Sequence, residues 1–185
     1  YAKSAEKLIS ATETNEINLR HDAPIYYLLS HSLELLLKGL LLSNGKSHED
    51  VEKFGHHLKN LYDVAKCEQS ELINGTESHV KSKWRTNLQK SRDEHKQKFI
   101  AIGITEPEDL SEWGVHENSV IGSELPVLPA QVDWLSARHT YEGGLFRYHQ
   151  TRYESIPHIT AFGLNMNVVF YSTLWACEYL GRNII

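Results

Sequence analysis

The sequence contains few of the residues that mark a disulfide-rich, metal-binding or highly basic protein. It has only two cysteines, Cys67 and Cys177, which lie far apart and form no CxxC pair. This pattern is typical of reduced thiols and argues against a disulfide framework or a cysteine-based zinc site. No HExxH motif and no Gly-rich phosphate loop occurs. The net charge of −5 argues against binding of nucleic acid through bulk positive charge.

A membrane-spanning segment is not expected either. The sequence has no signal-peptide pattern, and no uncharged apolar run is long enough to cross a bilayer. Its 185 residues, 41% apolar and 23% charged, are typical of one soluble domain with a sizeable core. We therefore expect a single cytoplasmic domain over residues 1–185.

The hydrophobic pattern predicts an all-α protein, folded as an antiparallel helical bundle. Residues 73–78 ("INGTES") are expected to form a turn. Residues 100–129, which hold scattered prolines, glycines and acids, predict an irregular insertion. The expected helices are 4–19, 24–42, 56–67, 80–99, a segment from 129 to the glycines at 143–144, and 158–180.

The helix expected at residues 24–42 carries a narrow polar stripe on an otherwise apolar surface. At about 100° per residue, Tyr27, His31, Glu34 and Lys38 project within roughly 60° of one another. In one interpretation the stripe is the helix's only solvent-facing edge, stabilised by an i,i+4 pair of Glu34 and Lys38. In the other, it lines a cleft used by a ligand or a second chain.

The adjacent histidines His56 and His57, together with His21, His31 and His48, could be considered as metal ligands. However, neighbouring side chains point to different faces of a helix, and no paired Glu-x-x-His element accompanies them. We therefore predict no metal site and no cofactor.

Two linked segments carry a resemblance to a known family. "SHSLELLLKGLLLSNG" followed by "KFGHHLKNLYDVA" resembles the HEPN (higher eukaryotes and prokaryotes nucleotide-binding) domains over residues 22–65. The elements that match are Glu34 to Lys38 in the apolar helix and His57 to Leu61 at the opening of the next helix. Glu34, Lys38, His31 and His57 are accordingly expected to support the fold or the site.

The resemblance implies a bundle of four or more helices that forms a homodimer. Many members of the family are metal-independent ribonucleases of toxin–antitoxin or defence systems. Others are non-catalytic modules that bind nucleotidyltransferases or other partner proteins. We therefore expect an RNA-directed homodimer, whose partner would be an antitoxin or a nucleotidyltransferase, or alternatively a non-catalytic module for dimerisation and for protein or nucleotide binding.

The ribonuclease members of that family carry an arginine and a later histidine with four to six residues between them. Here "RYESIPH" places five residues between Arg152 and His158. An imidazole can act as acid or base on the ribose 2′-OH, and a guanidinium can hold the scissile phosphate. Tyr153 stands where the family usually has a small polar residue, and Pro157 interrupts helical continuity. The alternative is that Arg152 forms an ion pair and His158 only begins a helix.

Two further segments could contact RNA. Arg147, Tyr148, His149 and Tyr153 interleave aromatic and basic groups, which suits stacking on unpaired bases but also suits packing in an interface. One face of the helix expected at 80–99 is basic beside Trp84 and Leu88. That face either follows an RNA backbone or is solvated on a helix docked through Trp84; its basic residues are Lys81, Arg85, Arg92 and Lys96.

Overall fold

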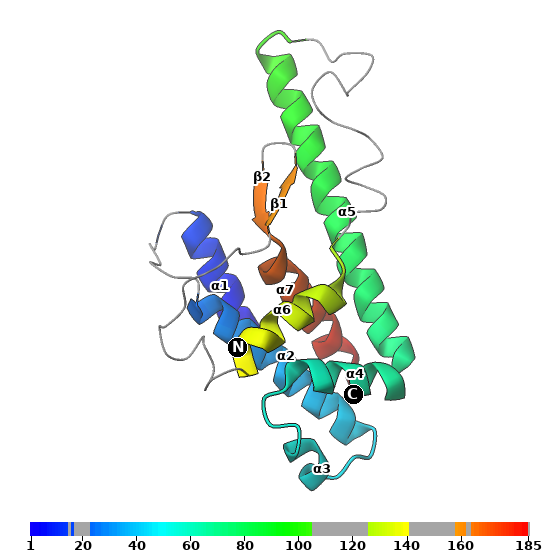
Figure 1. Ribbon diagram of the computed structural model, residues 1–185. Helices are drawn as coiled ribbons and strands as arrows, with labels where there is room; N and C mark the ends of the chain where they lie inside the picture. The colour runs from blue at the N-terminus through cyan, green and yellow to red at the C-terminus, as the bar shows by residue number, and fades with distance from the viewer. Residues whose placement is uncertain (15, 17–22, 105–125, 141–157, 162–163, 185) are drawn as a thin grey trace.

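The computed structural model describes residues 1–14, 16, 23–104, 126–140, 158–161 and 164–184 (Figure 1). The predicted all-α class and the helical bundle are confirmed, with one short hairpin added to the helices. The elements in chain order are α1 (Ala2–Glu13), α2 (Ala23–Ser43), α3 (His48–Glu52), α4 (Leu58–Glu68), α5 (Ser70–Ala101), α6 (Leu128–Thr140), β1 (His158–Ala161), β2 (Leu164–Asn167) and α7 (Val168–Asn183).

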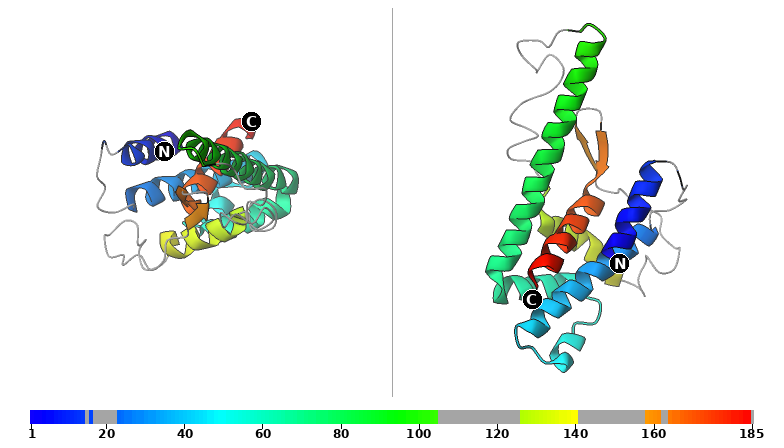
Figure 2. Two further views of the ribbon diagram at one scale, coloured as in Figure 1. Left: turned by 90° about the horizontal axis from the view of Figure 1, so that it is seen from above. Right: turned by 180° about the vertical axis from the view of Figure 1, so that it is seen from behind.

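The core of the bundle is built around α2 and α7. Leu29, Leu33 and Leu37 of α2 are completely buried, and α7 packs against both α2 and α5. Helices α1, α4 and α6 cover the remaining sides, while α3 lies at the base of the molecule (Figure 2). A helix that is apolar on nearly every side requires this central position, as its sequence indicates.

The end of α2 lies one residue beyond the predicted residue 42 and is set by a glycine. Gly45 has a φ of +91°, which L residues with a side chain rarely adopt. Its N–H donates to the Leu42 carbonyl at 3.0 Å, and that of Lys46 donates to the Leu41 carbonyl at 3.1 Å. These two bonds form a Schellman motif, which satisfies the carbonyl groups left open at a helix end.

The segment between α2 and α4 contains a short helix that the polar sequence does not reveal. The hydroxyl of Ser47 accepts the N–H of Asp50 at 3.1 Å and so caps the five-residue α3. His57 then occupies the N-cap position of α4, without a side-chain capping bond.

The turn predicted at residues 73–78 is wrong, because α5 runs without a break from Ser70 to Ala101. A Cβ on Gly75 would lie 2.7 Å from the hydroxyl of Tyr179, so this glycine permits close approach of α7 rather than a chain reversal. The C-terminal part of α5 extends well beyond the other helices (Figure 1). Of the insertion predicted at 100–129, residues 100–101 belong to the end of α5 and residues 128–129 to the start of α6.

The helix predicted at residues 158–180 begins ten residues too early. Residues 158–161 and 164–167 form two antiparallel strands in which His158 pairs with Asn167 and Ile159 pairs with Met166. The side chain of Asn167 accepts the N–H groups of Val169 and Phe170, at 3.0 and 3.1 Å, and so fixes the start of α7. Ile159 and Thr160 favour a strand, and Asn167 caps the helix that follows, so α7 does not include the apolar residues before it.

One described helix, α2, is long and apolar enough by composition to cross a membrane, and 56% of the relevant window is buried inside the bundle. Such burial is typical of a core helix. Both cysteines are free thiols, with Cys67 exposed and Cys177 buried.

Candidate functional site: a buried carboxylate among imidazoles

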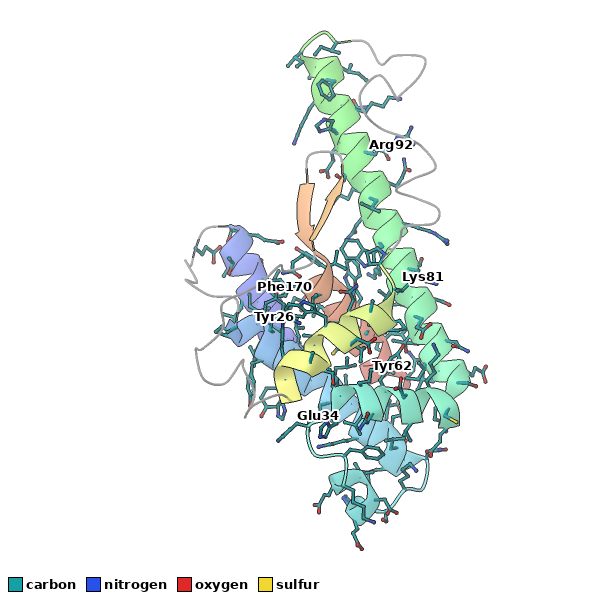
Figure 3. All side chains as sticks on the ribbon, in the orientation of Figure 1. Tyr26, Glu34, Tyr62, Lys81, Arg92 and Phe170 are labelled. Carbon is teal, nitrogen blue, oxygen red and sulfur yellow. The ribbon has the colours of Figure 1, made fainter. Side chains whose placement is uncertain are left out.

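Glu34 has the most deeply buried carboxylate of the described residues that form ion pairs. Only 1% of the residue is exposed, although it lies on the polar stripe of α2. The interpretation of this stripe as a solvent-facing edge is therefore wrong for Glu34. Figure 3 places it where α2 passes the end of α6 and the turn that precedes α4.

Three donors from different parts of the chain converge on this carboxylate. Lys38, one turn further along α2, donates to Oε1 at 2.7 Å, which confirms the predicted i,i+4 pair. Nδ1 of His56, in the turn before α4, lies 3.1 Å from Oε1 and 3.0 Å from Oε2. Nε2 of His139, near the end of α6, lies 2.9 Å from Oε2. Nδ1 of His31 is further away, at 3.9 Å from Oε2.

These contacts determine the ionisation of Glu34. Burial alone would raise its pKa, but hydrogen bonds from His139, Lys38 and His56 outweigh it and hold the pKa far below the ordinary value. A carboxylate only accepts hydrogen bonds, so Nδ1 of His56 and Nε2 of His139 carry protons in this arrangement. The group is an ionised carboxylate held by two imidazoles and one ammonium.

Solvent reaches this cluster from one side. The side chains of Glu34 and His139 are 2% and 1% exposed, whereas that of His56 is 47% exposed. Lys38 and His31 lie between these extremes, with side chains 21% and 20% exposed. The aromatic rings of Tyr27 and His31 stack at 5.8 Å beside the cluster. The predicted stripe is thus partly covered by α6 and partly open.

The lowered pKa of Glu34 predicts a specific acid sensitivity. Its ordinary pKa is 4.5 and its folded value is lower, so its contribution to stability is complete above pH 4.5. That contribution declines as the pH falls below 4.5. In urea unfolding at several pH values, the stability gap between the wild type and Glu34→Gln should therefore narrow steadily below pH 4.5. A gap that stays constant down to pH 2 would contradict the ionised, hydrogen-bonded carboxylate.

The predicted site residues differ in where the structure places them. Glu34 and Lys38 meet as predicted, and His31 lies beside them. His57 is exposed at the start of α4, and the neighbouring His56 contacts Glu34 instead. His158 is the first residue of β1. Five predicted residues lie outside the described residues: Arg147, Tyr148, His149, Arg152 and Tyr153.

Sequence reasoning did not single out His56 for this role, and it missed His139 entirely. The sequence gives no reason to choose His56 over His57 as the partner of Glu34, because the turn that orients His56 toward α2 is set by tertiary structure. His139 lies 105 residues after Glu34, and no local pattern links the two.

Helix α5, which carries the predicted basic face, packs against the bundle through Trp84. One of the two interpretations of that face requires this packing. Trp84 is fully buried and Leu88 is 2% exposed. A groove of about 920 Å³ follows the C-terminal half of this helix. Its lining combines three cations with two carboxylates, so this groove does not form a uniformly basic surface for RNA. The lining residues are Arg85, Thr86, Gln89, Lys90, Asp93, Glu94, Gln97 and Lys98.

No protein-family model matches the chain, and the searches found no significantly similar curated protein or solved structure. The function therefore has to be inferred from the sequence motifs and from this geometry alone.

Proposed function

We propose that this chain is a HEPN-like cytoplasmic protein that binds RNA and cleaves it without a metal ion, in a toxin–antitoxin or defence-type system. The observation that carries the proposal is the contact between the two parts of its HEPN-like signature. Lys38 and Glu34 pair at 2.7 Å on α2, and His56, from the segment that opens α4, lies 3.0 Å from the same carboxylate. The two segments that resemble HEPN domains are thus joined through one buried charge, and the imidazole that joins them is His56, next to the matched His57.

The backbone position of His158 also supports the proposal. His158 pairs with Asn167, whose side chain caps α7 and whose Nδ2 donates to the hydroxyl of Tyr26 on α2 at 2.7 Å. The start of β1 is therefore tied to the first turn of a buried helix and, through it, to the central helix. A general acid or base benefits from such a fixed support, because proton transfer requires a defined geometry.

In the proposed reaction the ribose 2′-OH attacks the adjacent phosphate. His158 takes the proton of this hydroxyl or supplies one to the leaving 5′-oxygen, and Arg152 holds the phosphate and stabilises its developing charge. Arg147, Tyr148, His149 and Tyr153 would contact bases and phosphates on either side. This chemistry requires no cofactor.

The test is cleavage of a mixed-sequence RNA in excess EDTA. We expect the wild type to cut and both Arg152→Ala and His158→Ala to lose cleavage while retaining the helical circular dichroism spectrum. Arg182→Ala and His48→Ala alter an exposed arginine and an exposed histidine far from the motif in sequence, and they should cut like the wild type. Cleavage that survives both motif substitutions would refute this assignment.

The proposed homodimer uses the outer face of α2. Leu35 is 45% exposed on this helix, and a Cβ on Gly39, one turn later, would meet nothing within 4 Å. Leu28 and Leu42 extend the same face at helical spacing. Leu35 is exposed, whereas Leu28 and Leu42 are partly buried against the core, so this face presents a narrow apolar strip that favours a protein–protein contact.

Leu35→Glu should convert the dimer into a monomer, because it places a charge within the apolar contact. Light scattering after size-exclusion chromatography measures the change. Ile102→Glu is the matched control, since Ile102 is 71% exposed at the end of α5. The Ile102→Glu variant should remain dimeric. A wild-type protein that is monomeric at micromolar concentration would contradict the proposed contact. A dimer that never cleaves RNA would instead favour the non-catalytic module that binds an antitoxin, a nucleotidyltransferase or a nucleotide.

A further inference from the structure

The donor atoms around Glu34 form a set that also suits a metal ion. Glu34, His56 and His139 each offer one ligand atom, and these three atoms lie within 4.8 Å of one another. Both imidazole nitrogens approach the same oxygen, Oε2, at 3.0 and 2.9 Å. Two histidine nitrogens and one carboxylate oxygen are a donor set that binds zinc in proteins and leaves a fourth position for another ligand.

From this convergence we infer that Glu34 Oε2, His56 Nδ1 and His139 Nε2 form a binding site for a divalent transition-metal ion of the Zn²⁺ type. The inference goes beyond the proposed RNA cleavage, which uses no metal, and does not depend on it. It also departs from the sequence-based prediction of no metal, which did not consider His139.

The spacing of the donors supports a tetrahedral ion. Zinc bonds of about 2.0–2.2 Å place neighbouring tetrahedral ligands about 3.3–3.5 Å apart. The observed separations from Oε2 are shorter by only a few tenths of an ångström. An ion could therefore replace the two hydrogen bonds after a small outward movement of the rings.

The three donor residues differ in solvent exposure, and the most exposed one gives the ion a route of entry. Glu34 and His139 are almost fully buried and come from helices, so their positions are fixed by packing. His56 comes from the turn before α4, and 47% of its side chain is exposed. The fourth coordination position would then face the side of His56, where water can reach the ion.

Lys38 has two opposing effects on such an ion. Its ammonium holds Oε1 at 2.7 Å and so leaves Oε2 to face the imidazoles. Its positive charge, however, repels a divalent cation at short range in a poorly solvated site. We expect repulsion to dominate, so that Lys38→Met binds Zn²⁺ more tightly than the wild type.

Metal binding would also move a proton on His139. In the hydrogen-bonded state the proton is on Nε2, which donates to Glu34, and the buried Nδ1 has no partner among the described residues. An ion on Nε2 requires the neutral ring to carry its proton on Nδ1 instead.

The experiment is calorimetric titration of ZnCl₂ into chelator-treated protein without RNA. We expect one Zn²⁺ per chain at this site, a loss of that binding in His56→Ala, and unchanged binding in His57→Ala. His56→Ala is preferred because its half-exposed side chain can be removed without disturbing the core, whereas the side chain of His139 is part of the core. MgCl₂ should give no binding, since Mg²⁺ selects oxygen ligands.

A tautomer measurement separates an ion from a purely structural cluster. Nitrogen NMR of the histidines should show the His139 proton moving from Nε2 to Nδ1 as Zn²⁺ is added. The inference is overturned if the wild type takes up no Zn²⁺, if His56→Ala binds it like the wild type, or if His139 keeps its Nε2 proton at saturation. None of these readouts changes if the chain fails to cleave RNA.

Discussion

Replacing Glu34 by alanine is expected to lower the free energy of unfolding by about 3–5 kcal/mol, the usual cost of removing one partner from a buried charge cluster. The carboxylate is 1% exposed and joins α2, α6 and the turn before α4. Without it, the buried ring of His139 loses its only hydrogen bond in the described part of the chain. Lys38 is left beside a cavity without its carboxylate partner. Urea unfolding followed by circular dichroism measures the loss.

The chain offers a matched control for this substitution. Lys59 and Asp63 on α4 form the same kind of i,i+4 pair at 2.9 Å, but their side chains are 46% and 53% exposed. Asp63→Ala should cost no more than about 0.5 kcal/mol, because solvent screens an exposed pair. Equal effects of the two substitutions would show that the cluster around Glu34 does not stabilise the bundle through its buried charge.

Replacing Trp84 by alanine should have an effect of similar size, about 3–5 kcal/mol. Trp84 is fully buried in the contact between α5 and α7, with its ring centroid 5.0 Å from that of Trp175. Its Nε1–H donates to the hydroxyl of Ser172 at 2.9 Å. Alanine would leave a large cavity and remove this buried hydrogen bond.

Trp84→Phe separates the two contributions. Phenylalanine retains most of the apolar contact but has no N–H group, so Ser172 loses its donor. We expect an intermediate loss of about 1–3 kcal/mol, within the range for an unsatisfied buried polar group. The measurement is again urea unfolding. A phenylalanine variant as unstable as the alanine variant would contradict the view that apolar packing dominates this contact.

Features set by local sequence could be predicted well. The end of α2 at Gly45 depends on one residue that adopts a positive φ, and the pairing of Glu34 with Lys38 depends on their spacing along one helix. The docking of α5 through Trp84 likewise depends on one large apolar side chain on a polar helix. In the first two cases the relevant contacts lie within a few residues, and in the third the type of a single residue indicates a buried position.

Features set by tertiary contacts could not be predicted in this way. Gly75 resembles a turn residue, but the approach of Tyr179 explains it. The strands before α7 depend on pairing between residues 158–161 and 164–167. The apolar pattern of the following helix continues into these residues, so the sequence does not indicate the pairing. The contact of His139 with Glu34 depends on how α6 crosses α2. Such long-range packing leaves no signal in a short sequence window.

The chemistry of cleavage provides the most direct test of the proposed function. An RNA with one 2′-deoxy nucleotide at the cut position should resist cleavage there in EDTA, because the proposed nucleophile is absent. The unmodified RNA should yield a product with a 2′,3′-cyclic phosphate. Cleavage at the 2′-deoxy position, or cleavage that occurs only with added Mg²⁺ and leaves a 3′-hydroxyl, would contradict a metal-independent ribonuclease.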